Sequence, residues 1–277
     1  MKRHATTLSS VLALAGALSA ALVALPASAS AEKAAAGAAS AAAVSPAAID
    51  VPALYAQHCA ACHAPNRLGA MGPALLPDNL GRLRKSEAAK VIAEGRAATQ
   101  MAGFAAQMSK EEIAALTEWI YSPVVPAPRW TDDDIRASRI VHVDPATLSD
   151  KPVFDADPMN LFLVVEAGDH HVSVLDGDKL EPIHRFQSRF ALHGGPKFAA
   201  EGRYVFFGSR DGWITKFDMW NLKVVAEIRA GINTRNVAVS PDGKHVAVAN
   251  YLPNNLVLLD GELNLIKSIE AKARDGK

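Results

Sequence analysis

The 277-residue sequence has few cysteines, and both of them, Cys59 and Cys62, lie in one five-residue segment. A structural zinc site needs four ligands, and no second pair of cysteines or histidines has a suitable spacing. A thioredoxin-like dithiol requires a βαβ context, which the surrounding sequence lacks. These two common uses of a cysteine pair are therefore disfavoured.

The sequence also lacks an excess of charge of one sign. Residues 1–31 contain two basic residues and no acidic one, so the rest of the chain has two more Asp and Glu than Lys and Arg. A nearly neutral, slightly acidic chain does not attract phosphate-rich surfaces. We therefore expect neither nucleic acid nor an anionic membrane as the main partner.

No uninterrupted apolar run is long enough for a permanent membrane helix. The most apolar stretch, Val11 to Leu25, is broken by serine and glycine. It follows two basic residues and precedes the small residues Ala29-Ser30-Ala31, which is the order of a secretory signal peptide with its cleavage site. We therefore expect a bacterial Sec signal peptide at residues 1–31, a periplasmic protein, and no membrane span after signal removal.

Residues 32–48 consist mostly of alanine and other small residues. They lack the large apolar side chains that would offset the entropy lost on ordering, so we expect a disordered linker. About 230 residues remain after this linker, which is enough for two domains.

The segment Cys59-Ala60-Ala61-Cys62-His63 has the Cys-x-x-Cys-His pattern of c-type haem attachment. Two thiols three positions apart can each form a thioether to one edge of the same porphyrin. His63 can then present an imidazole nitrogen to the iron as the proximal ligand. Covalent haem c is therefore the first expected cofactor.

Residues 49–123 alternate helical patterns with glycine and proline breaks, as in a small all-α domain. We predict helices at 51–62 and 86–94, with the loop at Gly72-Pro73 lying against the porphyrin. A capping box, Ser109-x-x-Glu112, begins the last helix. The residues that follow predict an apolar stripe that packs on the first helix: Ile113, Leu116, Trp119 and Ile120.

Residues 49–123 resemble class I cytochromes c, in which a methionine in the loop before the last helix is the sixth iron ligand. This resemblance implies Met101 as that ligand, and a thioether raises the potential in a way that suits an electron carrier. Met108, almost inside the capping box, and Met71, close behind the haem motif, remain as alternatives. His58 is expected to be a surface or supporting residue.

Beyond a proline-rich linker, residues 124–149, the pattern changes from helix to strand. Asp176, Asp218 and Asp260 each follow a run of alternating apolar residues, at intervals of 42 residues. A period of this length with several short strands is typical of β-propeller blades. For the middle unit we predict strands at 196–200, 203–209, 212–218 and 223–228, with a turn at Asp211-Gly212.

Propeller geometry predicts that several polar residues meet at one mouth of the central cavity. His193 and Arg235 lie at matching places before the inner strands of two units, while Arg210 and Tyr251 lie in loops between second and third strands. Such side chains could ligate a second iron and pair with its carboxylates. Polar loops without a function are the competing interpretation.

The adjacent residues His170 and His171 are a second candidate pair near the same mouth. On an extended strand they would point to opposite sides, so at most one of them would face the cavity.

A haem c domain followed by these strands resembles the periplasmic denitrification proteins that carry haem c and haem d1, namely the nitrite reductase and the dihydro-haem d1 dehydrogenase. The resemblance covers about residues 49–271. The segments that carry it are EAGDHHVSVLDGD (166–178), HGGPKF (193–198), GRYVFFGSRDGWITKFDMWNLKVVAEI (202–228), GINTRN (231–236) and NYLPNNLVLLD (250–260).

This resemblance implies that His193 is the proximal ligand of haem d1 or its dihydro precursor. It implies that Arg210, Arg235 and Tyr251 line the pocket, and it suggests that Tyr121 could reach the same cavity. Catalytic residues cannot be named. The relatives' propellers have eight blades and residues 150–277 supply about three. We therefore expect a truncated chain, small all-α cytochrome plus partial all-β propeller, that attaches haem c but does not hold haem d1 tightly.

The quoted segments resemble the dehydrogenase more than the reductase. This implies oxidation of a propionate of the precursor to an acrylate, with electrons passing to haem c. One alternative is reduction of nitrite to nitric oxide, and another is a plain electron carrier whose strands form a docking module. Expected partners are cytochromes or cupredoxins, and a haem d1 nitrite reductase that accepts the product.

Overall fold

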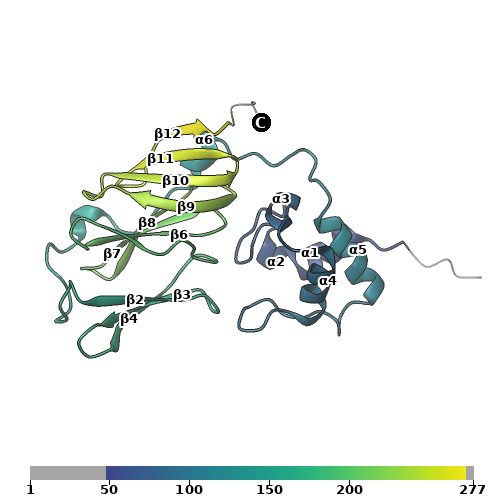
Figure 1. The fold of residues 1–277 in the computed structure, drawn as a ribbon, viewed down its shortest axis with the longest axis horizontal. Coiled ribbons are helices and arrows are strands. Elements are labelled where there is room, and N and C mark those ends of the chain that lie inside the picture. The colour runs from purple at the N-terminus through teal and green to yellow at the C-terminus, as the bar shows by residue number, and fades with distance from the viewer. Residues whose placement is uncertain (1–47, 273–277) are drawn as a thin grey trace, which may run out of the picture. The chain divides into compact units, whose positions relative to one another are not determined.

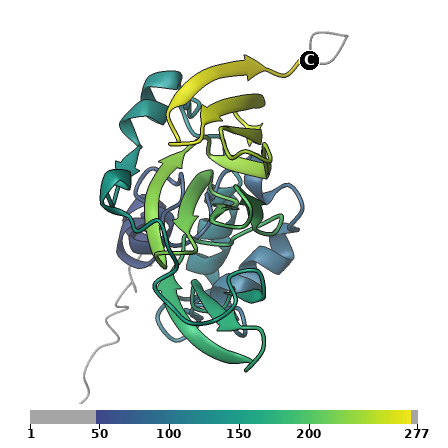
Figure 2. The same cartoon turned by 90° about the vertical axis from the view of Figure 1, so that its left-hand side faces the viewer.

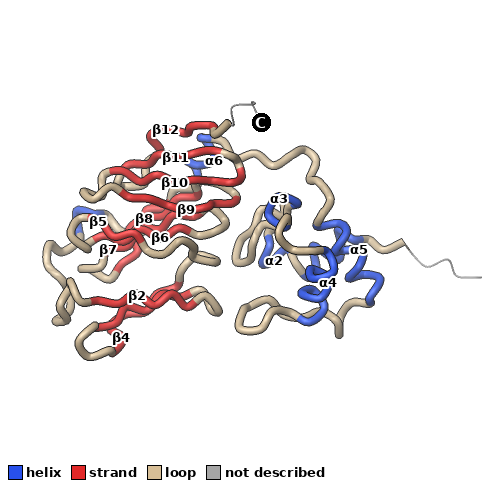
Figure 3. The backbone as a smooth tube through the Cα atoms, viewed as in Figure 1, coloured by secondary structure: helices blue, strands red, loops and turns tan. Residues whose placement is uncertain are grey.

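The computed structural model describes residues 48–272, so the expected signal peptide and most of the alanine-rich linker lie outside the described residues. Helices occupy the first part of this range and strands the second (Figure 3). The helices are α1 (Val51–His58), α2 (Ala60–His63), α3 (Pro77–Leu80), α4 (Lys85–Glu94), α5 (Lys110–Ile120) and α6 (Asp132–Ala137). None of the described helices is long and apolar enough to cross a membrane.

The helix predicted at 51–62 is divided into α1 and α2 at Cys59. Asp50 caps α1, because its carboxylate accepts a hydrogen bond of 3.1 Å from the N–H of Ala53. Cys59 departs from the ideal helix angles, with φ −119° and ψ −35°, and Ala64 ends α2 with φ 63°. The break places the first cysteine in the core, whereas Cys62 is exposed.

The last helix of this part, α5, is confirmed with its capping box. The hydroxyl of Ser109 accepts from the N–H of Glu112 at 3.1 Å, and the Glu112 carboxylate accepts from the N–H of Ser109 at 2.7 Å. The predicted stripe is buried in one cluster with Tyr55 of α1, whose ring lies 4.9 Å from that of Trp119. The stripe therefore joins the two ends of the helical part.

The strands form three antiparallel sheets (Figure 1). Sheet 1 contains β2 (Leu161–Glu166), β3 (His171–Asp176) and β4 (Glu181–Gln187). Sheet 2 has the order β1-β8-β7-β6-β5, with β1 (Ile140–Val141), β5 (Lys197–Ala199), β6 (Tyr204–Gly208), β7 (Trp213–Asp218) and β8 (Lys223–Arg229). Sheet 3 contains β9 (Asn233–Val239), β10 (His245–Leu252), β11 (Asn255–Asp260) and β12 (Leu265–Glu270).

The four strands predicted for the middle unit are β5 to β8. The sequence interpretation did not foresee structure in residues 124–149, which contain α6 and β1. The helix starts at Thr131, whose hydroxyl accepts from the N–H of Asp134 at 3.3 Å in a second capping box. Strand β1 pairs with β8 and so extends sheet 2.

Sheet 2 is buried on both faces because it packs between sheet 1 and sheet 3, and Figure 2 shows the three sheets in this order. Along β6, Val205 and Phe207 pack with Val172 and Val174 of sheet 1, while Phe206 packs with sheet 3. Full burial of a side chain such as Phe206 contributes roughly 1.5–3 kcal/mol. Consecutive antiparallel sheets packed in this way are the arrangement found in β-propellers.

The aspartates at 42-residue intervals have a common structural role. Each one ends a strand, and its Oδ1 accepts hydrogen bonds from two backbone N–H groups of the turn that follows. These groups belong to Asp178 and Lys179 for Asp176, to Trp220 and Asn221 for Asp218, and to Glu262 and Asn264 for Asp260. The 42-residue spacing of the aspartates therefore reflects one turn that occurs in each of the three sheets.

Candidate functional site

The first candidate site surrounds His63, which ends α2 and is buried. Its Nδ1 lies 2.8 Å from the carbonyl oxygen of Pro73. A carbonyl oxygen only accepts hydrogen bonds, so Nδ1 carries the proton and Nε2 keeps a lone pair. Burial lowers the pKa of His63, although the Pro73 bond opposes this change, and a lowered pKa favours the neutral imidazole that binds a metal.

The two cysteines differ in their surroundings. Cys59 belongs to the core cluster, and burial, followed by repulsion from Cys62, raises the pKa of its thiol to about 11. Cys62 is exposed on α2. The two thiols therefore differ in exposure although they lie only three positions apart.

Gly72 fits this site because its backbone packs directly against the imidazole. A Cβ at this position would lie 2.8 Å from Cε1 and 2.9 Å from Nδ1 of His63. The loop predicted to lie against the porphyrin therefore already supports the ring of His63. Two thiols, a neutral imidazole with a free nitrogen and this close backbone together fit covalent haem c.

Met101 lies in the loop between α4 and α5 and is half-buried. Its carbonyl accepts from the N–H of Arg96 at 2.9 Å, and its N–H donates to the hydroxyl of Thr99 at 3.2 Å. Gly95 permits this return of the chain, since a Cβ there would lie 2.6 Å from the Met101 carbonyl oxygen. The loop backbone is therefore fixed before any ligand is bound.

The alternative methionines have different surroundings. Met108 is buried in the core formed by α1, α4 and α5, where it is 5% exposed. Met71 is 54% exposed in the turn before Gly72. His58 packs edge-on against Phe104, with ring centroids 5.8 Å apart, which agrees with a supporting role.

Tyr121 was suggested by the family resemblance to reach the expected haem d1 cavity. It is the C-cap residue of α5. Its hydroxyl donates to the carbonyl of Leu83 at 2.5 Å, and Lys85 Nζ lies 5.8 Å from the ring centroid. In the described structure Tyr121 is thus bound within the helical part.

Sequence reasoning missed Arg67, which is 4% exposed. Its guanidinium donates to the carbonyls of Leu75 at 2.8 Å, Ile120 at 2.5 Å and Ser122 at 3.1 Å, and it lies 4.6 Å from the ring of Trp119. The hydrogen-bond partners of this buried guanidinium are thus three backbone carbonyls. Arg67 therefore connects the loop after the haem motif to the end of α5. No local sequence pattern predicts such a contact.

The second candidate site surrounds His193, in the loop before β5. Its N–H donates to the carbonyl of Gly208 at 2.7 Å, and its Nδ1 lies 3.2 Å from the carbonyl oxygen of Arg235 on β9. As at His63, the carbonyl partner accepts a hydrogen bond from Nδ1, and in the neutral ring the lone pair is then on Nε2, where it can bind a metal. The two residues 42 positions apart are therefore in contact across sheets 2 and 3.

Arg210 and Tyr251 lie at the same end of the sheets. The N–H of Arg210 donates to the carbonyl of Ala191, and its own carbonyl accepts from Thr234, the neighbour of Arg235. Tyr251 is 50% exposed and follows Asn250, which pairs with Thr234 across the sheet. The structure thus brings the four predicted residues to one edge.

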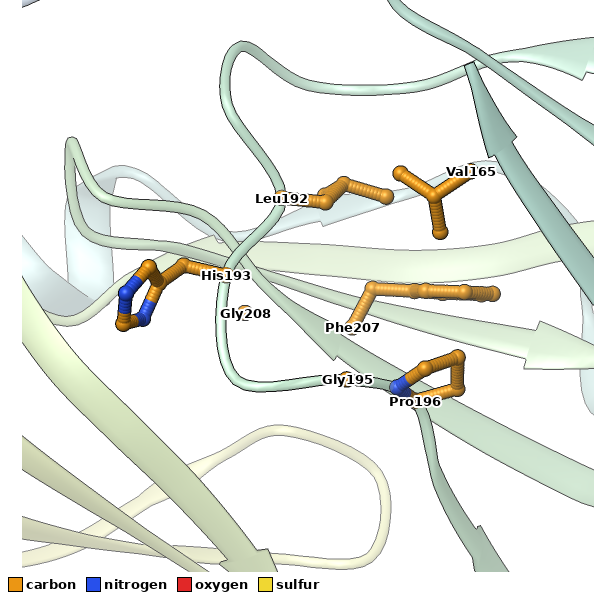
Figure 4. A pocket seen from close by; sticks show the side chains of 7 residues that line it. All are labelled: Val165, Leu192, His193, Gly195, Pro196, Phe207 and Gly208. Atoms are coloured by element: carbon orange, nitrogen blue, oxygen red, sulfur yellow. The ribbon is translucent and has the colours of Figure 1, made fainter. Parts of the chain in front are cut away.

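An apolar pocket of about 180 Å³ lies beside this loop, lined by Val165, Leu192, His193, Gly195, Pro196, Phe207 and Gly208. In Figure 4 the imidazole of His193 points away from Leu192, Val165 and Phe207. The histidine therefore borders this pocket rather than filling it. A tetrapyrrole is larger than this volume, so the pocket alone does not enclose one.

His170 and His171 do not both lie on an extended strand, so the prediction for this pair was wrong. His170 is not on an extended strand, because it adopts φ 60° in the turn before β3. Its ring packs edge-on against Phe190 and its Nδ1 is buried without a hydrogen-bond partner. His171 begins β3, and its Nδ1 lies 2.9 Å from the carbonyl oxygen of Asp169.

Two protein families match this chain in succession. Residues 46–120 match the family described as cytochrome C oxidase, cbb3-type, subunit III. Residues 156–277 match the cytochrome D1 heme domain. The first match contains the Cys-x-x-Cys-His site and the second contains His193.

Dihydro-heme d1 dehydrogenase of Pseudomonas aeruginosa is 57% identical over 226 residues, which are 81% of this chain and 46% of that protein. Nitrite reductase of Stutzerimonas stutzeri is 27% identical over 245 residues, covering 80% of this chain and 43% of that protein. The solved structure of dihydro-heme d1 dehydrogenase NirN in complex with DHE matches with a TM-score of 0.75 and 57% identity, over 81% of this chain and 49% of that one.

This chain spans about half the length of these relatives. Within that span the chain is 57% identical to the dihydro-heme d1 dehydrogenase. It contains, in this order, a segment that matches the cbb3-type cytochrome family and a segment that matches the cytochrome D1 heme domain.

Proposed function

We propose that this chain oxidises dihydro-haem d1 during haem d1 formation in the bacterial periplasm. The observation that carries the proposal is the presence, in one chain, of a c-type haem site and of a second histidine whose Nε2 is free, within a match to the cytochrome D1 heme domain. In the reaction two C–H bonds of a propionate break, one C=C bond forms, and two protons and two electrons leave.

His193 presents Nε2 to the metal of the bound tetrapyrrole, and Arg210 and Arg235 pair with its carboxylates. Both arginines are exposed. Within residues 48–272 neither guanidinium has a carboxylate at ion-pair distance, whereas Arg189 and Arg203 each have one. The uncompensated charge suits an anionic ligand, and Tyr251 adds a phenol beside it.

Haem c, when attached, supplies one-electron redox chemistry. Cys59 and Cys62 would hold the porphyrin through thioether bonds, and His63 and Met101 would bind its iron. Two electrons leave the substrate, so this chain must give the first to a cytochrome or cupredoxin before it takes the second. A haem d1 nitrite reductase would receive the product.

The domain division that we propose follows the sequence interpretation. Residues 1–31 are the signal peptide, 49–123 the cytochrome c domain, 124–149 the connection, and 150–277 the first part of a haem d1-type propeller. The 42-residue repeat and the three sheets support about three blades. Strand β1 of the connection belongs to the middle blade.

The test mixes the haem c-loaded protein, with its haem oxidised, with dihydro-haem d1 and an oxidised cupredoxin in the absence of oxygen, because one haem c accepts only one of the two electrons. We expect a product lighter by two hydrogens in the mass spectrum, together with the absorbance of reduced haem c. His193→Ala should lower the rate at least about tenfold, while His245→Ala, at the opposite end of β10, should not. Unchanged substrate with oxidised haem c would contradict the proposal.

Nitrite reduction is the second candidate, because a nitrite reductase is 27% identical. Release of nitric oxide from nitrite by the reduced protein, without loss of hydrogen from dihydro-haem d1, would favour it. A reducible c-type spectrum with neither reaction would favour an electron carrier with a docking module.

A further inference from the structure

The loop from His193 into β5 contains two successive glycines with left-handed backbones, Gly194 with φ 81° and Gly195 with φ 71°. Both conformations favour glycine. Their surroundings differ, because a Cβ on Gly194 would overlap the Oδ1 of Asn236 and lie 3.0 Å from its Cγ. A Cβ on Gly195 would meet nothing within 4 Å.

Asn236 is held in place on β9. Its Oδ1 accepts from the N–H of Val237 at 2.9 Å, so the side chain is fixed against its own strand. The preceding residue, Arg235, supplies the carbonyl oxygen 3.2 Å from Nδ1 of His193. Arg235 therefore contacts His193, and its neighbour Asn236 contacts Gly194. A displacement of Gly194 would consequently alter the hydrogen bond between the imidazole and the Arg235 carbonyl.

Lys197 binds the backbone of the two glycines. Its Nζ donates to the carbonyl of Gly194 and to that of Gly195, the latter at 3.3 Å. In the part of the chain that the structure describes, no carboxylate lies at ion-pair distance from this ammonium group, unlike that of Lys216, which pairs with Glu262 at 2.8 Å. The charge of Lys197 is thus engaged with the loop backbone.

We propose that Gly194, Lys197 and Asn236 are positioning residues that keep Nδ1–H of His193 on the Arg235 carbonyl and so present Nε2 to an incoming metal. The opposite tautomer would present an N–H group, which cannot bind a metal. Residues that orient a ligating histidine typically change affinity by about 10–100-fold when they are replaced. The proposal rests on the proposed function for the identity of the ligand, but the tautomer is a property of the protein alone.

The first test measures the tautomer by ¹⁵N NMR of the full chain without tetrapyrrole, under conditions in which the ring is neutral. His193→Gln identifies the signal among the nine histidines. We expect one tautomer, with the proton on Nδ1, in the natural protein. Gly194→Ala and Lys197→Met should give mixtures of tautomers.

Gly195→Ala is the matched control, because it introduces the same backbone strain with open space around the new methyl group. It should keep the single tautomer. The double variant G194A/N236A removes the overlapping side chain and should recover part of the original signal. An unaltered tautomer in G194A and K197M, or equal changes in G194A and G195A, would overturn the proposal.

The second test titrates each variant with dihydro-haem d1, with the far-ultraviolet circular dichroism as a control for folding. We expect binding to G194A and K197M to be at least about tenfold weaker than to the natural protein. Equal affinity of all variants would refute the positioning role. A natural protein that binds no tetrapyrrole but shows the expected tautomer changes would contradict the proposed function and leave the positioning role intact.

Discussion

The Nδ1 atom of His63 lies 2.8 Å from the carbonyl oxygen of Pro73, and the residue before that proline, Gly72, packs against the same imidazole. One short loop thus fixes the tautomer of the ring and supports its face. His193 has the same relationship to a carbonyl of the neighbouring sheet, at 3.2 Å. Both candidate ligands therefore present Nε2 through a backbone hydrogen bond to Nδ1.

Replacing Gly72 by alanine should disturb the haem c site. The new methyl group would lie 2.8 Å from Cε1 of His63, so the ring must tilt away from the Pro73 carbonyl. Forcing a methyl group into a packed site costs about 1–3 kcal/mol. We expect a lower haem content and weakened axial ligation in the ferric spectrum. Gly81→Ala is the control, because its Cβ would have only ordinary contacts at 3.7 Å. Equal haem content and spectra would contradict this interpretation.

Replacing Met101 by leucine should leave haem c covalently attached and lower its midpoint potential, because a thioether ligand stabilises ferrous iron. Met108→Leu conserves volume in the core and should keep the potential. Potentiometric titration of both variants tests this. A potential that falls only in Met108→Leu would assign the sixth ligand to Met108.

The two thiols of the haem-free protein should react with iodoacetamide at different rates. The pKa of Cys59 is raised to about 11 by burial and by Cys62, so its thiolate fraction at pH 8 is about one in a thousand. Its rate should increase tenfold for each pH unit up to about pH 11, because only the thiolate reacts. Cys62 is exposed and should be modified first.

Peptide mapping by mass spectrometry measures the two rates separately. Cys62→Ser removes the faster thiol and should leave the slow, strongly pH-dependent reaction of Cys59. Equal rates for both cysteines, or a rate for Cys59 that does not change between pH 7 and pH 9, would show that the first thiol is not buried as described.

Asp218→Ala should destabilise the sheets strongly. Asp218 is fully buried, and its carboxylate accepts from two turn N–H groups and from Arg203, at 3.1 Å. Leaving a buried donor without its acceptor costs about 1–3 kcal/mol, and the two turn N–H groups lose theirs in this variant. Denaturant unfolding should show a much smaller change for Asp242→Ala, an exposed turn aspartate. Similar losses in both variants would rule out this role.

Local signals in the sequence predicted much of the fold. The capping box at Ser109 and Glu112 needs only residues three positions apart, and the aspartates at 42-residue intervals mark turns that each sheet forms separately. The break at Cys59 and the turn at His170 escaped prediction, since both depend on single backbone angles that side-chain periodicity does not reveal.

Features that depend on contacts between distant segments could not be predicted. The guanidinium of Arg67 donates hydrogen bonds to carbonyls that lie 53 and 55 residues further along the chain, a pattern with no sequence signature. The contact between Gly194 and Asn236 requires the packing of sheet 2 on sheet 3. The 42-residue spacing of His193 and Arg235 nevertheless predicted that these two residues would be neighbours.

The central claim is that Cys59 and Cys62 bind a haem covalently and that His63 ligates its iron. Intact mass and the pyridine haemochrome spectrum of protein produced in a host that matures c-type cytochromes test it most directly. We expect one haem for each chain, and none in a variant with both cysteines replaced by serine. A natural protein with the mass of the bare polypeptide and no haemochrome absorbance would contradict the claim.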